Sequence, residues 1–343
     1  MSAAGAASAA ATASPDSSSG AASLARIRAP VQGLLEAVVE EMSRSVANDA
    51  PIVAQMGHHL MAMRGKMFRP TLLLLCSEVE GASEPAAIPL ATAVEMIHLA
   101  TLVHDDAIDH SVLRRGMPTL NSLFSHQLSV IMGDFLYSTA LSRLVALGNL
   151  DALRVLTRAS TEMSLGEMRQ LAMTNALSFS EDDYDALIRS KTASLMSAAC
   201  EVGSLCGARD YREELLSYGE SLGTAFQIVD DLIDYTEARE TTGKPTGLDL
   251  REHKVTLPLI AALRVMPAPD RRIVDDFFAD PEPSDMSIAE VIRIVGENGG
   301  LDYARKRGAM FASRAEQALT GLPDTVARQS LIDSISYVME RHS

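Results

Sequence analysis

Aromatic residues are scarce in this sequence: they make up 4% of its 343 residues, and tryptophan is absent. Cysteine is scarce too. The three cysteines, Cys76, Cys200 and Cys206, cannot all pair, and Cys200 and Cys206 lack the C-x-x-C spacing of a zinc or redox site. We therefore expect them to be small core residues in a reducing compartment.

Positive charge is also in short supply. The 30 Lys and Arg residues are outnumbered by 45 Asp and Glu residues, which gives a net charge of −15. This balance excludes a nucleic-acid surface, because phosphate backbones select stripes of Lys and Arg. If the ligand is an anion, cations must be gathered locally.

Long apolar runs and targeting signals are missing as well. No stretch approaches the run of about 20 apolar residues that spans a bilayer. The N-terminus has no charged segment that leads into an apolar one. We therefore expect a cytoplasmic protein without a transmembrane segment.

Helical patterning is what the sequence does contain. Ala, Leu, Met, Ile and Val supply most of the 47% apolar content, and this composition favours helix. From Leu24 onward apolar residues recur at helical spacing, whereas no segment of comparable length alternates with a period of two. We predict an all-α fold, a single-domain helical bundle of about ten helices over residues 24–343. Residues 1–23, nearly all Ala, Ser and Gly, are predicted to be a disordered tail.

The stretch "LVHDDAIDH" carries the first group of carboxylates. Asp105 and Asp109 are four residues apart, so on a helix they share a face, with Asp106 beside them. An apolar stretch precedes them, and adjacent carboxylates at a buried helix end need a neutralising cation. Hard oxygen ligands point to Mg²⁺, which keeps several waters and bridges carboxylates to phosphate oxygens. Taken alone, a solvated acidic turn explains this motif slightly better.

A second acidic turn, "FQIVDDLIDY", repeats the pattern with Asp230, Asp231 and Asp234. Two matching turns on apolar helices predict metals held from two sides. Two other acidic stretches, residues 181–185 and 275–280, follow loop-like sequence. We interpret them as helix starts, where carboxylates cap the helix and complement its dipole.

Cations flank both acidic turns. Lys66 and Arg69 precede Pro70, which is predicted to be the first residue of a helix, so the pair indicates a diphosphate-sized anion site. A simple basic loop explains this stretch equally well. His98 lies two turns before Asp105 on roughly the same face, where it could hydrogen-bond a phosphate.

Two further basic segments follow the acidic turns. Arg114 and Arg115 lie just past the first one, within reach of a ligand held at its end. The Gly- and Pro-broken stretch 242–258 carries Lys244 and Lys254 after the second. We predict that this loop closes over the site; the alternative is a flexible linker.

Five motifs occur together in one order: "GKMFRP", "HDDAIDHSVLRRGMPT", "SKTASL", "GTAFQIVDDLIDY" and "GKPTGLDLREHKVTLP". In these motifs the chain resembles the all-trans polyprenyl diphosphate synthases, from about residue 26 to the C-terminus. The resemblance implies an all-α prenyltransferase fold whose central cavity is capped by the two Asp-rich motifs. It implies a homodimer, with possible transient membrane contact for product release.

The resemblance also assigns roles to residues. It implies three Mg²⁺ ions on the allylic diphosphate, held by Asp105, Asp109 and Asp230, with Asp106, Asp231 and Asp234 as ligands or in the outer shell. The isopentenyl diphosphate site comprises Lys66, Arg69, His98 and Arg115. The allylic diphosphate is contacted by Arg114, Lys191, Lys244 and Lys254, and the developing cation faces Thr192 and Gln227. The chain departs from the family pattern at two places: it reads Arg64, Gly65, Lys66, Met67 where Gly-Gly-Lys-Arg is usual, and His253 replaces the usual Gly.

Product length is predicted from the residues before Asp105, because the growing tail must run back past Thr101, Ala100 and Ile97. Short-chain members of the family have a bulky block here. We therefore predict a product longer than geranylgeranyl diphosphate, as used for quinone side chains. The alternatives are a short-chain synthase, a terpene cyclase, a non-catalytic partner subunit and a structural helical protein. The second Asp-rich motif argues against the cyclase and the non-catalytic subunit, and a structural protein does not explain paired acids with paired cations.

Overall fold

A computed structural model describes residues 23–47, 49–172, 176–236 and 246–342. The predicted all-α class is confirmed: almost all of the described chain is helical. The predicted tail, residues 1–23, lies outside the described residues except for its last position.

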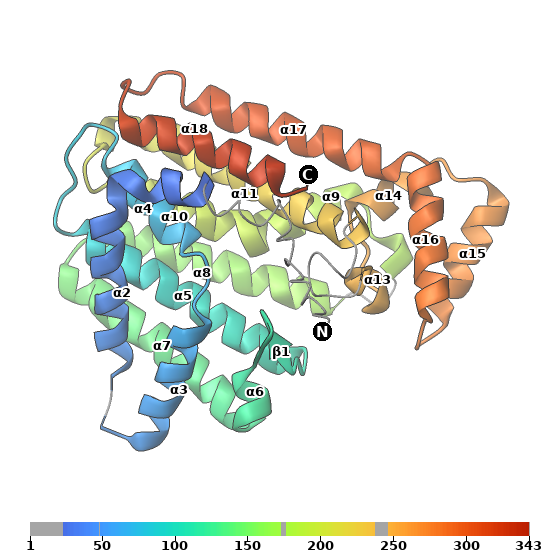
Figure 1. Ribbon diagram of the computed structural model, residues 1–343, viewed down its shortest axis with the longest axis horizontal. Coiled ribbons are helices and arrows are strands. Elements are labelled where there is room, and N and C mark those ends of the chain that lie inside the picture. The colour runs from blue at the N-terminus through green and yellow to red at the C-terminus, as the bar shows by residue number, and fades with distance from the viewer. Residues whose placement is uncertain (1–22, 48, 173–175, 237–245, 343) are drawn as a thin grey trace, which may run out of the picture.

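The helices follow one another with short joins (Figure 1). In the first half they are α2 (Gln32–Val46), α3 (Pro51–Met63), α4 (Phe68–Ser77), α5 (Ala87–Ile108), α6 (Leu120–Leu123), α7 (His126–Leu147) and α8 (Leu150–Leu171). In the second half they are α9 (Glu181–Ile188), α10 (Ser194–Ser204), α11 (Arg212–Thr236), α13 (Leu248–Arg251), α14 (Leu257–Leu263), α15 (Ala268–Ala279), α16 (Asp285–Glu297), α17 (Gly300–Ala318) and α18 (Val326–Met339). Single-turn 3₁₀ helices occupy Ala29–Val31, Ala176–Ser178, Arg209–Tyr211 and Glu340–His342, and a π-helical turn occupies Arg189–Ala193.

Strand β1 (Leu113–Arg114) and strand β2 (Met117–Pro118) form a small antiparallel hairpin after α5. Its two turn residues, Arg115 and Gly116, have φ values of +52° and +75°. This pair of left-handed residues is the turn geometry that suits the twist of a two-residue hairpin. The hairpin holds Arg114 and Arg115 close to the end of α5.

Local sequence explains where several helices begin. Ser180 caps α9 by accepting a hydrogen bond from the Asp183 N–H, so the prediction of a helix start at residues 181–185 is confirmed. The same prediction for residues 275–280 is wrong, because α15 begins at Ala268 and those carboxylates lie at its end. Pro267 and Pro269 there start a helix, because proline fits the first turn, whereas we interpreted them as loop residues.

Buried helices form a central layer around which the others pack. Helix α5 is buried over most of its surface and lies against α2, α4 and α7, while α10 lies between α4, α8 and α11. Figure 1 shows α17 and α18 along one side of the molecule and the pair α15 and α16 at one end. The predicted count of about ten helices is too low for the described residues, because the C-terminal third is divided by short turns.

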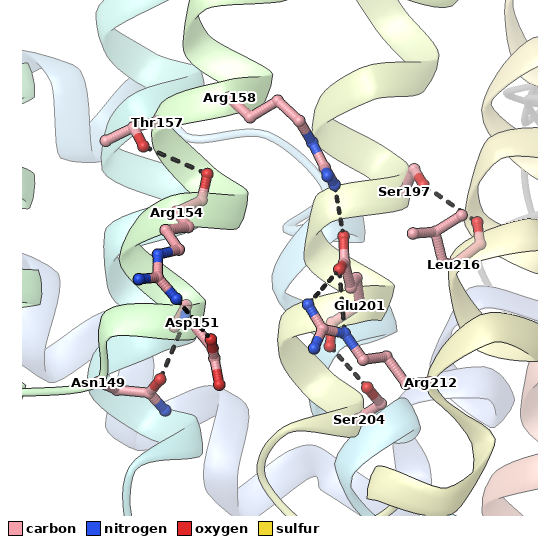
Figure 2. A network of polar contacts seen from close by, with 11 residues as sticks. Asn149, Asp151, Arg154, Thr157, Arg158, Ser197, Glu201, Ser204, Arg212 and Leu216 are labelled. Atoms are coloured by element: carbon pink, nitrogen blue, oxygen red, sulfur yellow. Dashed lines mark hydrogen bonds and ion pairs between the residues drawn. The ribbon is translucent and has the colours of Figure 1, made fainter.

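A buried ion cluster ties three of these helices together at the end of α10. Glu201 is 3% exposed and accepts hydrogen bonds from Arg158 of α8 at 2.7 Å and from Arg212 of α11 at 2.7 and 3.1 Å. Figure 2 shows the carboxylate between the two guanidinium groups. Because α10 and α11 are fixed here, their other ends are held in register at the site described below.

The expectation that no stretch approaches 20 apolar residues meets two candidates in the described chain, but neither is a firm membrane span. By length and composition α5 and α7 both pass as candidate spans among the described residues. However, 67% of the most apolar stretch of α5 is buried inside the protein, against 28% for α7. Helix α5 is apolar because it forms the core, whereas α7 leaves Ile131 and Val145 exposed among polar residues.

Candidate active site

The first acidic turn lies at the end of α5. Asp105 is largely enclosed, and burial raises its pKa to about 6; Lys191 opposes this shift and Glu167 adds to it. Asp109 is the exposed residue that ends the helix. Asp106 is buried and accepts hydrogen bonds from Arg114, whose Nε lies 2.9 Å from each carboxylate oxygen. The Arg114 guanidinium is therefore already paired with the Asp106 carboxylate.

The second acidic turn lies near the end of α11, and each carboxylate has a different partner. Asp230 is half exposed and pairs with Arg341 at 3.2 Å. Asp231 is buried and accepts hydrogen bonds from Tyr184 and Gln227; burial raises its pKa well above the usual range. Asp234 accepts the backbone N–H groups of Leu248 and Asp249 at 2.9 Å each and so anchors α13.

A cavity of about 430 Å³ lies between the two acidic turns, and we name it the acidic cavity. Its wall includes Asp109, Lys191, Thr192, Gln227, Asp231, Asp249 and Lys254. Lys191 pairs with Glu167 at 2.6 Å, and Lys254 pairs with Glu252 at 2.6 Å. Lys244 lies outside the described residues.

A second cavity, of about 510 Å³, contains the other predicted anion site, and we name it the basic cavity. Its wall includes Lys66, Arg69, His98, Arg115, Arg341, Glu95 and Phe226. Buried nitrogens of two of these residues, Arg69 Nε and Arg341 Nη1, have no hydrogen-bond partner within the described chain. Orphaned buried donors are costly, and an anion in this cavity would satisfy them.

Two close contacts set the shape of the basic cavity. Arg69 Nη1 lies 3.1 Å from His98 Nε2, and because a guanidinium can only donate, this nitrogen of His98 accepts. Burial lowers the pKa of His98 well below its usual range, and the neighbouring arginines lower it further. A Cβ at Gly65 would lie 2.2 Å from Arg115 Nη1, so glycine leaves room for the Arg115 guanidinium in its present position.

A third, more apolar cavity of about 300 Å³ lies between α5 and α8, and we name it the tail cavity. It is lined by Thr101, His104, Asp105, Ile108, Met163, Ser164, Glu167, Met168, Leu171 and Lys191. Ile97 lies one turn before Thr101 on the same face of α5 and is fully buried. Ala100 is buried but lines none of the three cavities. The tail cavity starts beside Asp105, where a substrate tail would enter.

The chain matches a known protein family in sequence. The sequence profile described as "Polyprenyl synthetase" matches residues 50–295, which is more than half of the chain. The chain belongs to the polyprenyl synthetase family. The resemblance stated from the sequence motifs is thereby confirmed.

Individual members of the family are similar over almost the whole chain. An all-trans-nonaprenyl-diphosphate synthase (geranyl-diphosphate specific) of Rhodobacter capsulatus is 37% identical over 92% of this chain and 97% of its own length. An octaprenyl diphosphate synthase of Escherichia coli is 34% identical over 90% of this chain and 95% of its own. A solved polyprenyl synthase structure from Caulobacter crescentus, complexed with calcium and isoprenyl diphosphate, has a TM-score of 0.88 at 32% identity, covering 93% of this chain and 98% of that one.

The two departures from the polyprenyl synthetase pattern both lie at left-handed backbone positions. Met67 has φ +47° and precedes α4; His253 has φ +54° at the edge of the acidic cavity. Glycine adopts this conformation freely, which explains the Gly usual in the family at the second position. His253 is held there by a hydrogen bond from Nε2 to the Asp280 carbonyl at 2.9 Å and by contacts with Phe277 and Phe278.

Some of these positions were missed or misplaced from sequence. Helix α4 begins at Phe68, so the prediction of a helix start at Pro70 is two residues late and Arg69 lies within the first turn. Asp249 was not predicted: burial raises its pKa to about 7, and it faces the acidic cavity. Glu95, buried near Arg69 and Arg115, was also missed. A carboxylate buried beside paired arginines carries no spacing signal in sequence, because its partners come from other helices.

Proposed function

We propose that this chain is a trans-prenyltransferase that condenses an allylic diphosphate repeatedly with isopentenyl diphosphate, giving a medium- or long-chain all-trans polyprenyl diphosphate for a quinone side chain. One observation carries the proposal. Consecutive residues of α11 face different cavities: Phe226 lines the basic cavity and Gln227 lines the acidic cavity. Two anion sites that abut across one helix suit a reaction between two diphosphates.

The acidic residues fit Mg²⁺. Asp105 is buried close to Glu167 and Asp109, so its ionised form needs a cation nearby. Among the described residues, no three His, Cys, Asp or Glu side chains converge closely enough to hold a metal ion alone. The carboxylates of the two acidic turns supply hard oxygen donors, and these suit Mg²⁺ because it completes its shell with water and phosphate oxygens. We assign Asp105, Asp109 and Asp230 as ligands of three ions, which when bound supply positive charge to the departing diphosphate.

The side chains of the two cavities have separate roles in binding the two diphosphates. Lys191 and Lys254 border the acidic cavity and hold the allylic diphosphate. Lys66, Arg69 and Arg115, with neutral His98, hold the isopentenyl diphosphate in the basic cavity, so that its double bond lies close to the allylic carbon. Thr192 and Gln227 present oxygen dipoles where positive charge develops.

Product length follows from the tail cavity and from the relatives. The relatives described above carry the names nonaprenyl and octaprenyl diphosphate synthase. In this chain Thr101 is one of the α5 residues that line the tail cavity, and it is small enough to let a growing tail pass. We therefore infer a product longer than geranylgeranyl diphosphate.

We further propose that the chain acts as a homodimer. Large apolar side chains on α7 and α8 are exposed: Ile131 60%, Val145 65%, Leu150 62%, Met168 58% and Leu171 60%. Scattered apolar residues need no explanation, but Met168 and Leu171 lie close together at the end of α8, beside the tail cavity, and burial against a partner would stabilise them. Isologous contact of this face with a second copy would cover it.

Turnover by the purified chain tests the proposal. We expect farnesyl diphosphate and labelled isopentenyl diphosphate to give polyprenyl products with Mg²⁺ and none with a chelator. The alternatives give different outcomes: a short-chain synthase stops at farnesyl or geranylgeranyl diphosphate, and a non-catalytic subunit forms no product alone.

A further inference from the structure

Four side chains form a continuous hydrogen-bonded chain along the wall of the acidic cavity. Tyr184 of α9 donates to Asp231 Oδ2 at 2.6 Å, and Gln227 Nε2 donates to Asp231 Oδ1 at 2.8 Å. Thr192, in the π-helical turn, donates to Gln227 Oε1 at 2.7 Å. Tyr184, Asp231 and Thr192 are all less than 9% exposed. Three separate segments thus meet in one polar chain.

The direction of this chain is set by its acidic member. Asp231 accepts both of these hydrogen bonds through its two oxygens, so the amide nitrogen of Gln227 is turned toward Asp231. The amide oxygen then points away and receives the Thr192 hydroxyl. Because the Thr192 hydroxyl and the Gln227 amide nitrogen donate within the chain, the oxygen atoms of both residues still have lone pairs that can face the cavity.

Close packing of the backbone makes the chain possible. A Cβ at Gly223 would lie 2.7 Å from Ala193 Cα, so glycine lets α11 approach the π-helical turn at this point. Gln227 lies one helical turn after Gly223, and Thr192 is the neighbour of Ala193. This approach brings the Gln227 and Thr192 side chains within hydrogen-bonding distance.

Tyr184 lies on α9, and ion pairs and hydrogen bonds on both sides of Tyr184 hold this helix in place. At the start of α9, Glu181 accepts hydrogen bonds from Tyr303 at 2.8 and 3.0 Å and pairs with Arg264. One turn later Asp185 pairs with Arg307 of α17. Tyr184 therefore has little freedom to move, and its hydroxyl fixes the carboxylate of Asp231.

We propose that Tyr184 is a positioning residue for the condensation: by holding Asp231, it keeps the oxygens of Gln227 and Thr192 turned toward the allylic cation. This inference rests on the proposed function. When the allylic C–O bond breaks, its electron pair leaves with the diphosphate oxygen and positive charge spreads over the allyl carbons. Oxygen dipoles already in place stabilise that charge without reorganising.

The test compares two ligands that differ in charge at the allyl group. Farnesyl S-thiolodiphosphate resembles the uncharged substrate, and an analogue of farnesyl diphosphate with a protonated nitrogen in place of carbon 3 resembles the cation. In Tyr184→Phe we expect the Kd of the cationic analogue to rise about tenfold, while the Kd of the uncharged analogue stays within about twofold. The kcat should fall by about tenfold with both KM values nearly unchanged.

Tyr218→Phe is the matched control. Tyr218 is also fully buried, and its hydroxyl donates to the Leu331 carbonyl at 3.0 Å, away from the three cavities. This variant should lose a comparable amount of folding stability and should leave both Kd values unchanged. Comparison of the two variants separates the general effect of removing a buried tyrosine hydroxyl from the specific effect of removing the Tyr184 hydroxyl.

A double-mutant cycle with Thr192→Val tests whether Tyr184 acts through the chain. If it does, Tyr184→Phe should cost much less affinity for the cationic analogue when Thr192 is already replaced. Additive effects, equal weakening of both ligands, or no change in either Kd would each overturn the inference. Wild-type protein that binds neither analogue would instead overturn the proposed function on which it rests.

Discussion

Replacing Thr101 by tyrosine should shorten the product. Thr101 lines the tail cavity and is four residues before Asp105, so its Cα lies about 6 Å back along α5. An isoprene unit extends about 5 Å, roughly one helical pitch. A tyrosine ring at this position therefore leaves room for about one to two units beyond the reacting end. Products should stop at or below geranylgeranyl diphosphate.

The substitution should also change the choice of primer without preventing the first condensation. The reacting ends lie above the new ring, so geranyl diphosphate should still be extended, whereas kcat/KM for farnesyl diphosphate should fall more steeply. Because the cavity of about 300 Å³ can receive the ring, folding stability should change little. In contrast, Ala100→Tyr places the ring in the packed core, because Ala100 lines none of the three cavities; it should lose about 1–3 kcal/mol of stability.

Chromatography of dephosphorylated products provides the assay, with thermal melting as the check on folding. Thr101→Val is the control: it keeps the size of the side chain, loses only the hydroxyl that donates to the His98 carbonyl at 2.7 Å, and should make wild-type products. Unchanged product length in Thr101→Tyr would refute the path of the tail through this cavity.

Three other predictions follow from the two anion sites. Asp105→Ala or Asp230→Ala should lower kcat by at least about a thousandfold with helical content intact by circular dichroism; wild-type turnover at saturating Mg²⁺ would contradict the metal assignment. Arg69→Ala should mainly raise the KM for isopentenyl diphosphate and Lys191→Ala that for the allylic primer, and equal shifts of one KM would contradict the division between cavities. Burial raises the pKa of Glu95 from 4.5 to about 6, so between these pH values the native state binds more protons than the unfolded state. The free energy of unfolding should therefore fall by about 2 kcal/mol as pH rises through this range. Urea unfolding of the wild type and of Glu95→Gln, which lacks the titrating group, measures the difference.

Much of the fold could be predicted from local sequence, because buried helices here are long and strongly patterned. The positions of both acidic turns, and the helix start at Glu181, follow from an apolar run or a capping serine next to carboxylates. The helix that begins at Ala268 was missed because two prolines precede and open it, and proline is equally common in loops. The sequence alone does not distinguish a proline that begins a helix from a proline in a loop.

The partners of the site residues could not be predicted in the same way. Asp105 and Asp106 are neighbours in sequence, yet one borders the tail cavity and the other is paired with Arg114. Likewise Asp231 is satisfied by Tyr184, which lies 47 residues earlier in the chain. Side chains within one acidic motif therefore differ in availability, and tertiary packing alone decides which of them face a ligand.

The central claim is that the acidic cavity holds the allylic diphosphate while the basic cavity holds isopentenyl diphosphate. A crystal structure of the protein with farnesyl S-thiolodiphosphate, isopentenyl diphosphate and Mg²⁺ tests it most directly. We expect the thiolodiphosphate between Asp105 and Asp230, its tail directed past Thr101, and the isopentenyl diphosphate against Arg69 and Arg115. Exchanged positions of the two ligands, or metal ions bound away from both acidic turns, would contradict it.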